Sequence, residues 1–138
     1  MKIIIPIFLL ACMFAVGGCY FKGKASDLVG IYQAELPDRG LEQLELLSDG
    51  RCLQKIQLAN GETYMAQGTW KWNYSPDRNR GSSYIIFSKI RSPLYAGKIR
   101  KDLANEPGNG IIARPVYRGI FGSIKIMFRE GHYYEKIK

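Results

Sequence analysis

The run from Tyr64 to Tyr74 constrains the fold of this chain more than any other stretch. Aromatic or small side chains occupy every second position, and mostly polar side chains lie between them. This period of two residues is typical of a β-strand with one buried face, because successive side chains of a strand point to opposite sides. The run therefore predicts a long strand whose inner face carries Tyr64, Trp70, Trp72 and Tyr74.

Turn-forming residues separate this strand from its neighbours. Asp49-Gly50 and Asn60-Gly61 are dipeptides that two-residue hairpin turns prefer, because glycine adopts a positive φ without strain. Glu130-Gly131 and the polar stretch 75–81 mark further hairpins. The strand-like segments between the turns are Leu28–Glu35, Leu41–Leu47, Arg51–Ala59, Tyr64–Tyr74, Ser83–Ile90, Ile111–Tyr117, Ser123–Arg129 and His132–Ile137.

Strands that follow one another through tight turns predict an all-β, antiparallel meander. About eight strands can close into a small barrel, which removes the exposed edges. Gly68, inside the longest strand, indicates a bend or a close approach to a neighbouring backbone. Residues 91–110 break the pattern, and their mixture of glycine, proline and basic residues predicts a long loop with one helical turn near Lys98 to Ala104.

The N-terminal residues have the composition of an export signal. Lys2 precedes an apolar run from Ile3 to Val16, and two small residues follow the run. The run is shorter than the about 20 residues that a membrane-spanning helix needs. The sequence therefore predicts a removable signal peptide, with an uncleaved N-terminal anchor as the alternative.

The end of this signal, Val16-Gly17-Gly18-Cys19, resembles the lipobox of bacterial lipoproteins. The resemblance implies that residues 1–18 are removed and that Cys19 carries a diacylglyceryl group. It also implies the outer membrane as the destination in a host that has one, because Tyr20 is not the aspartate of inner-membrane retention. An ordinary signal followed by a chance cysteine remains the alternative. We expect residues 19–26 to form an acylated, mobile linker and residues 27–138 to form the barrel domain.

The chain is basic, with 20 Lys and Arg against 12 Asp and Glu and a formal net charge of +8. A basic exported domain suits an anionic membrane surface, an anionic envelope polymer or an acidic partner, although charge spread over solvated faces would give the same total. Of the three cysteines, Cys12 lies in the leader and Cys19 would be acylated. Cys52 therefore has no partner within the mature chain, and we expect it to be a buried apolar residue, with a reactive thiol or an intermolecular disulfide as the alternative.

Five short segments, in their order along the chain, carry a resemblance to a known group of proteins. They are Leu28-Val29-Gly30-Ile31-Tyr32, Leu44 to Arg51 (LELLSDGR), Gly68-Thr69-Trp70-Lys71-Trp72, Ile85-Ile86-Phe87 and Tyr133-Tyr134-Glu135-Lys136-Ile137. Together they resemble small, mostly uncharacterised bacterial lipoproteins with a lipocalin-like, calycin-type barrel. The resemblance implies this fold for residues 27–138, and lipocalin-like proteins often bind hydrophobic small molecules. It carries over no functional residue.

Motifs for catalysis and for metal binding are incomplete. His132 is the only histidine, and no Gly-x-Ser-x-Gly elbow is present, so a serine triad or a histidine zinc site lacks its parts. Gly108–Ala113 matches a dinucleotide fingerprint in letters but lacks the flanking strand and helix. Asp77–Gly81 contains two arginines and lacks the distal glutamate of a calcium loop. We predict no enzyme activity, no metal and no cofactor.

The acids Glu42, Glu45 and Asp49 could pair for acid–base chemistry, but nothing in the sequence brings two of them together, and solvated strand faces explain them.

Two functional hypotheses remain. In the first, the barrel binds an apolar or amphipathic small molecule, and the aromatic face lines the pocket instead of filling the core. The residues of this face are Tyr64, Trp70, Trp72 and Tyr74.

In the second hypothesis, the chain is a non-enzymatic interaction or inhibitor lipoprotein. A basic loop would contact an envelope protein or an anionic polymer. Its candidate residues are Lys89, Arg91, Lys98, Arg100 and Lys101. A solvated loop without a partner is the structural alternative. Nucleic acid is not an expected partner of an exported, membrane-held domain.

Overall fold

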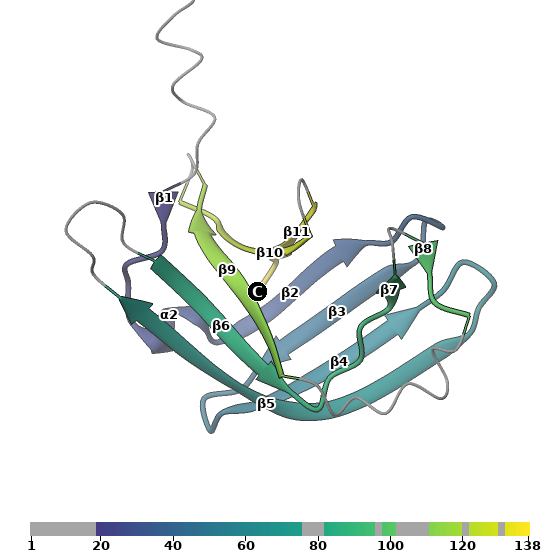
Figure 1. The fold of residues 1–138 in the computed structure, drawn as a ribbon, viewed down its shortest axis with the longest axis horizontal. Helices are drawn as coiled ribbons and strands as arrows, with labels where there is room; N and C mark the ends of the chain where they lie inside the picture. Colours follow the sequence, from purple (N-terminus) through teal and green to yellow (C-terminus); the bar gives the residue numbers. More distant parts are fainter. Residues whose placement is uncertain (1–18, 76–81, 96–97, 102–110, 120–121, 130–131) are drawn as a thin grey trace, which may run out of the picture.

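Eight antiparallel strands close into a barrel in the order in which they occur along the chain (Figure 1). The computed structural model describes residues 19–75, 82–95, 98–101, 111–119, 122–129 and 132–138. The barrel strands are β2 (Gly30–Glu35), β3 (Leu41–Leu46), β4 (Arg51–Gln57), β5 (Thr63–Ser75), β6 (Ser82–Ser88), β9 (Ile111–Arg118), β10 (Ile124–Arg129) and β11 (His132–Lys136). Pairing of β11 with β2 closes the ring. The predicted all-β meander barrel is confirmed.

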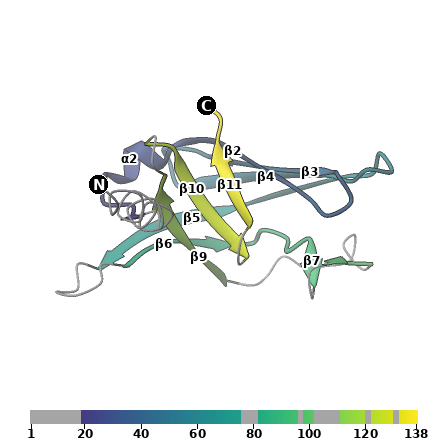
Figure 2. The ribbon, with the colours of Figure 1, turned by 90° about the horizontal axis from the view of Figure 1, so that it is seen from above.

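Four short elements complete the described fold. β1 (Cys19–Tyr20) pairs with β9, and the single-turn helix α2 (Ala25–Leu28) precedes β2. β7 (Leu94–Tyr95) and β8 (Lys98–Ile99) form a separate hairpin. Figures 1 and 2 place α2 and β7 at opposite ends of the long axis of the molecule.

Three-residue loops, rather than two-residue turns, join two of the hairpins at the predicted glycines. Leu47 N donates to Arg51 O at 3.0 Å, and Gly50 N donates to Leu47 O at 3.1 Å. Gly50 has a φ of 86° and Gly61, in the next loop, a φ of 91°. A turn followed by one residue in the left-handed region makes such a loop. The positions of the turns were predicted correctly, but the loop length was wrong.

β5 alternates as the sequence predicts. Trp70 is buried and Trp72 is half-buried, whereas Lys71 between them is exposed. Gly68 lies where a Cβ would collide with the carbonyl oxygen of Ser88 in β6. The expected close backbone approach at Gly68 is therefore confirmed.

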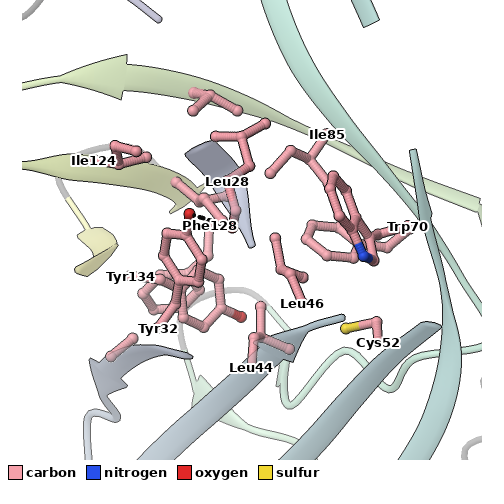
Figure 3. Packing of buried hydrophobic residues seen from close by; sticks show 14 of the residues in the cluster. Leu28, Tyr32, Leu44, Leu46, Cys52, Trp70, Ile85, Ile124, Phe128 and Tyr134 are labelled. Carbon is pink, nitrogen blue, oxygen red and sulfur yellow. Dashed lines mark hydrogen bonds between the residues drawn. The ribbon is translucent and has the colours of Figure 1, made fainter. Parts of the chain in front are cut away.

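A large apolar cluster fills one part of the barrel. Its side chains come from opposite walls and meet inside (Figure 3). The Tyr32 hydroxyl donates to Leu28 O at 2.7 Å, which ties α2 to this core. The buried members are Phe21, Leu28, Tyr32, Ala34, Leu44, Leu46, Cys52, Trp70, Ile85, Phe87, Ile90, Val116, Ile124, Ile126, Phe128 and Tyr134.

A small apolar cluster forms separately from the large one. It consists of Leu36, Ile56 and Leu58, and Tyr64 and Ile99 pack against it. Because Ile99 belongs to β8, this cluster lies at the β7–β8 side of the barrel. All strands of the ring and both clusters lie within residues 19–138, so this part of the chain contains the interactions that hold the described fold together.

Candidate functional site

The aromatic face of β5 extends along the barrel and does not converge on one point. Trp70 lies in the large cluster. The indole N–H of Trp72 donates to Ser83 Oγ at 2.7 Å, and its ring stacks on Tyr74 with the centroids 5.8 Å apart. Tyr64 packs instead against the small cluster. About 33 Å of extended strand separates Tyr64 from Tyr74, so one small ligand does not reach all four aromatic residues.

We call the basic segment 89–101 the strap, and its described residues, 89–95 and 98–101, lie against the barrel interior. Ile90 is buried in the large cluster, and Ile99 packs against the small cluster. Gln54 of β4 holds the strap backbone between these two points. Gln54 Nε2 donates to Arg91 O at 2.7 Å, and Arg91 N donates to Gln54 Oε1 at 2.7 Å. The described part of the strap is therefore docked across both clusters.

The five basic residues of the strap differ in exposure. Lys89, Lys98 and Lys101 are exposed, whereas Arg91 and Arg100 are half-buried. The prediction of a helical turn near Lys98 is wrong for the residues described there, because Lys98–Ile99 forms the strand β8. Residues 102–104, where the turn would end, lie outside the described residues. The short hairpin instead brings Ile99 onto the small cluster, and this packing overrides the local helical tendency.

Glu42 is the site residue that the sequence reasoning missed. The expectation of a solvated strand face is wrong for Glu42, because this side chain is fully buried. Gln54 Nε2 donates to Glu42 Oε1 at 2.6 Å. Within the described part of the chain, Glu42 Oε2 has no hydrogen-bond partner. The two-residue spacing of the strand could have identified Glu42 as inward-facing, because it places Glu42 on the same face as Leu44 and Leu46.

Burial raises the pKa of Glu42 to about 7, because a carboxylate loses its hydration inside the barrel. Hydrogen bonding by Gln54, the nearby Tyr134 hydroxyl and the positive charge of Arg114 lower this pKa in part. Burial, reinforced by the charge of Glu42, raises the pKa of Tyr134 well above its usual range. Near neutral pH, Glu42 therefore populates both its neutral and its charged form.

The other candidate groups do not form a second site in the described structure. Cys52 is a buried free cysteine, as predicted, and burial together with the charge of Glu42 raises its pKa to about 12. His132 belongs to β11. Ile111–Ala113 lies in β9, so the helix that a dinucleotide fingerprint requires is not formed there. Asp77–Gly81 lies outside the described residues.

Within the ranges that the structure describes, no group of three or more His, Cys, Asp or Glu side chains could hold a metal ion. In the same ranges, no helix has the length and apolar character needed to span a membrane. A scan against protein-family models and searches of the curated proteins and of the solved structures gave no match. The lipoprotein resemblance and the acylation of Cys19 therefore stay predictions.

Proposed function

We propose that this chain is a lipid-anchored lipoprotein of the cell envelope whose barrel binds an apolar or amphipathic small molecule. The acyl chains on Cys19 would hold it to the outer membrane of a diderm host, or otherwise to the outer face of the cell membrane. The closed ring of eight strands supports the binding role, because barrels of this size can hold one small ligand. The proposal includes no catalytic step, metal or cofactor.

The buried carboxylate of Glu42 carries the binding part of this proposal. An unpaired polar atom inside a protein costs about 1–3 kcal/mol, so native structures contain few of them. In the sheet register, Glu42 pairs with Ala34 on one side and with Ile56 on the other. Ala34 belongs to the large cluster and Ile56 to the small one. The free oxygen of Glu42 thus lies at the boundary between the two apolar clusters.

This arrangement favours a ligand with a hydrogen-bond donor or a cationic amine at one end and an apolar body. The donor would satisfy Glu42 Oε2, and the apolar body would extend along the small cluster. Leu36, Leu58 and Ile99 would then cover it. An anionic head group fits poorly, because the charged form of Glu42 would repel it.

Gln54 connects this site to the strap. Its amide nitrogen donates both to Glu42 Oε1, at 2.6 Å, and to Arg91 O, at 2.7 Å. A ligand that reaches Glu42 from the small-cluster side must displace the part of the strap that lies there.

Two fluorescent probes with the same alkyl chain test the proposal, a dansyl alkylamine and a dansyl fatty acid. Energy transfer from Trp70 and Trp72 to the dansyl group reports binding to residues 19–138. We expect saturable, one-to-one binding of the amine. Glu42→Gln should weaken it by about 10-fold or more, because a hydrogen bond to a charged group contributes about 1.5–3 kcal/mol.

Glu45→Gln is the matched control, because Glu45 lies on the opposite face of the same strand. It should leave amine binding unchanged. Leu58→Ala should weaken both probes, because it removes apolar surface from the small cluster. Equal effects of Glu42→Gln and Glu45→Gln, or the absence of saturable binding by the amine probe, would contradict the proposal.

The exposed cations of the strap favour a second candidate function. Lys98 and Lys101 are exposed at the β7–β8 end and could contact an acidic envelope protein or an anionic polymer. This function predicts salt-sensitive retention of the protein on a polyanion column, with loss of retention in Lys98→Glu/Lys101→Glu. Retention of this kind without probe binding would favour the second function over the first.

A further inference from the structure

The predicted linker is part of the barrel where it begins. Cys19 lies opposite Arg118 and Tyr20 lies opposite Tyr117 in the β1–β9 pairing. Phe21 continues the contact, since its N–H donates to Val116 O at 3.0 Å and its side chain is fully buried. A mobile spacer would leave these residues solvated. The acylation site therefore adjoins the barrel wall directly.

An open depression of about 400 Å³ lies beside this strand. Tyr20, Lys22, Gly23 and Arg118 line it. Its two cationic side chains are both exposed, and neither is in an ion pair with any residue that the structure describes. The nearby carboxylate of Asp27 accepts a hydrogen bond from Lys24 N at 2.9 Å. The depression thus combines two available positive charges with an aromatic wall.

The backbone and the core hold this depression in shape. A Cβ at Gly23 would collide with the Phe21 ring and lie 2.7 Å from Asp27 Oδ2, so only glycine fits between them. The guanidinium of Arg118 lies 5.5 Å from the centroid of the Phe21 ring, within the range of a cation–π contact. One of the two cations is therefore positioned by a side chain that is itself fixed in the core.

Tyrosine side chains continue outward from the depression over β9 and β11. The rings of Tyr20 and Tyr117 stack with centroids 5.0 Å apart, and Tyr133 meets Tyr117 edge-on at 6.1 Å. Tyr133 remains 40% exposed. Tyrosine prefers the boundary between membrane and water, because its ring is apolar and its hydroxyl is polar. This row of three rings starts at the residue that follows the acylation site.

We propose that the depression binds the phosphate group of an anionic lipid in the membrane that carries the Cys19 acyl chains. This inference rests on the lipid attachment within the proposed function. With no spacer after Cys19, the acyl chains hold the β1 end of the barrel against the head groups. Lys22 and Arg118 then lie at the level of the lipid phosphates, and the tyrosines lie at the interface. The small cluster, at the β7–β8 side, faces away from the bilayer.

The test uses residues 19–138 with Cys19→Ser, so that no acyl chain contributes to binding. Co-sedimentation with vesicles of phosphatidylcholine, with and without phosphatidylglycerol, measures the partition coefficient. We expect a preference for the phosphatidylglycerol vesicles. Each basic residue near an anionic surface contributes about 1 kcal/mol, or about fivefold in affinity. Lys22→Gln/Arg118→Gln should therefore lower the partition by about 25-fold.

The matched control is Lys55→Gln/Lys71→Gln, which removes the same charge from exposed positions of β4 and β5. It should change the partition much less. Lys22→Gln alone should lower the partition coefficient about fivefold. Because this substitution is at an exposed position, it also separates loss of binding from loss of folding in the Arg118 variant. Equal loss in both double variants would overturn the proposal, because net charge alone would then explain binding. Displacement by inorganic phosphate at constant ionic strength would also overturn it, because the site would then recognise the free ion.

The outcome is separable from that of the proposed function. Vesicle binding by the acyl-free protein does not require Cys19 to be modified. Mass spectrometry of the full chain tests the modification, and the dansyl probes test the barrel interior. If mass spectrometry found Cys19 unmodified, or if the dansyl probes did not bind, the vesicle result could still be interpreted by itself.

Discussion

Replacing Glu42 with glutamine should remove most of the pH dependence of stability between about pH 4.5 and pH 7. Burial raises the pKa of Glu42 from its ordinary value of 4.5 to about 7 in the folded protein. Between these values the folded state holds a proton that the unfolded chain has released. The free energy of unfolding therefore falls as the pH rises through this window, and the stabilisation is complete only below it.

The size of the effect follows from the shift. One pH unit corresponds to about 1.36 kcal/mol for each proton, so a window of about 2.5 units gives about 3 kcal/mol. Glutamine keeps the oxygen that accepts from Gln54 Nε2, but it cannot ionise. Its amide group changes the baseline stability at all pH values, because a new donor replaces the unpaired oxygen. The slope against pH, not the absolute stability, is therefore the informative quantity.

Urea denaturation followed by the fluorescence of Trp70 and Trp72 measures this slope, with series at about pH 5 and about pH 8. The parent protein should lose about 2.5 kcal/mol between the two, because pH 5 already lies inside the window, and Glu42→Gln should lose much less. Glu45→Gln, on the outward face, should behave like the parent. Asp49, whose pKa is lowered by its bonds with Arg51, titrates below this range. Parallel pH profiles for the parent and Glu42→Gln would refute the reasoning.

Two further predictions concern the packing of the barrel. Gly61→Ala should destabilise the protein by about 1 kcal/mol, because residue 61 has a positive φ but open space around a Cβ. Gly68→Ala should destabilise it by more, because the new Cβ would collide with Ser88 O. Thermal unfolding of the two variants checks the difference, and equal melting temperatures would contradict it. In residues 19–138 with Cys19→Ser, the Cys52 thiol should resist Ellman's reagent at pH 8, because burial raises its pKa to about 12. Rapid labelling without denaturant would contradict the burial of Cys52, and rapid labelling in urea is the expected control.

The sequence was sufficient for the features that depend on local pattern. The period of two residues in β5 placed Trp70 and Trp72 on the inner face, and the turn glycines at 50 and 61 placed two hairpins. Such patterns arise from neighbouring residues, so they need no knowledge of the rest of the fold. The count of about eight strands then favoured closure into a barrel, because closure leaves no exposed strand edges.

The candidate site depends on contacts between distant segments, which the sequence does not display. Glu42 lies inside the closed ring, where Arg114 of β9 and Tyr134 of β11 come near enough to lower in part the pKa that burial raises. The strap docked because Gln54, 37 residues before Arg91, offers both a donor and an acceptor to its backbone. Phe21 joined the core through the pairing of β1 with β9. None of these partners is recognisable before the ring is closed.

The seam between β2 and β11 makes the barrel dependent on its last-synthesised strand. Lys138 O accepts from Ile31 N, and Ile31 O accepts from Ile137 N, both at 2.8 Å. Gly30 is needed at this seam, because a Cβ there would collide with Lys138 O. A nascent chain that stops before β11 has two open strand edges, and open edges recruit other chains or proteases. Translation that ends early should therefore yield rapidly degraded fragments instead of a partly working barrel.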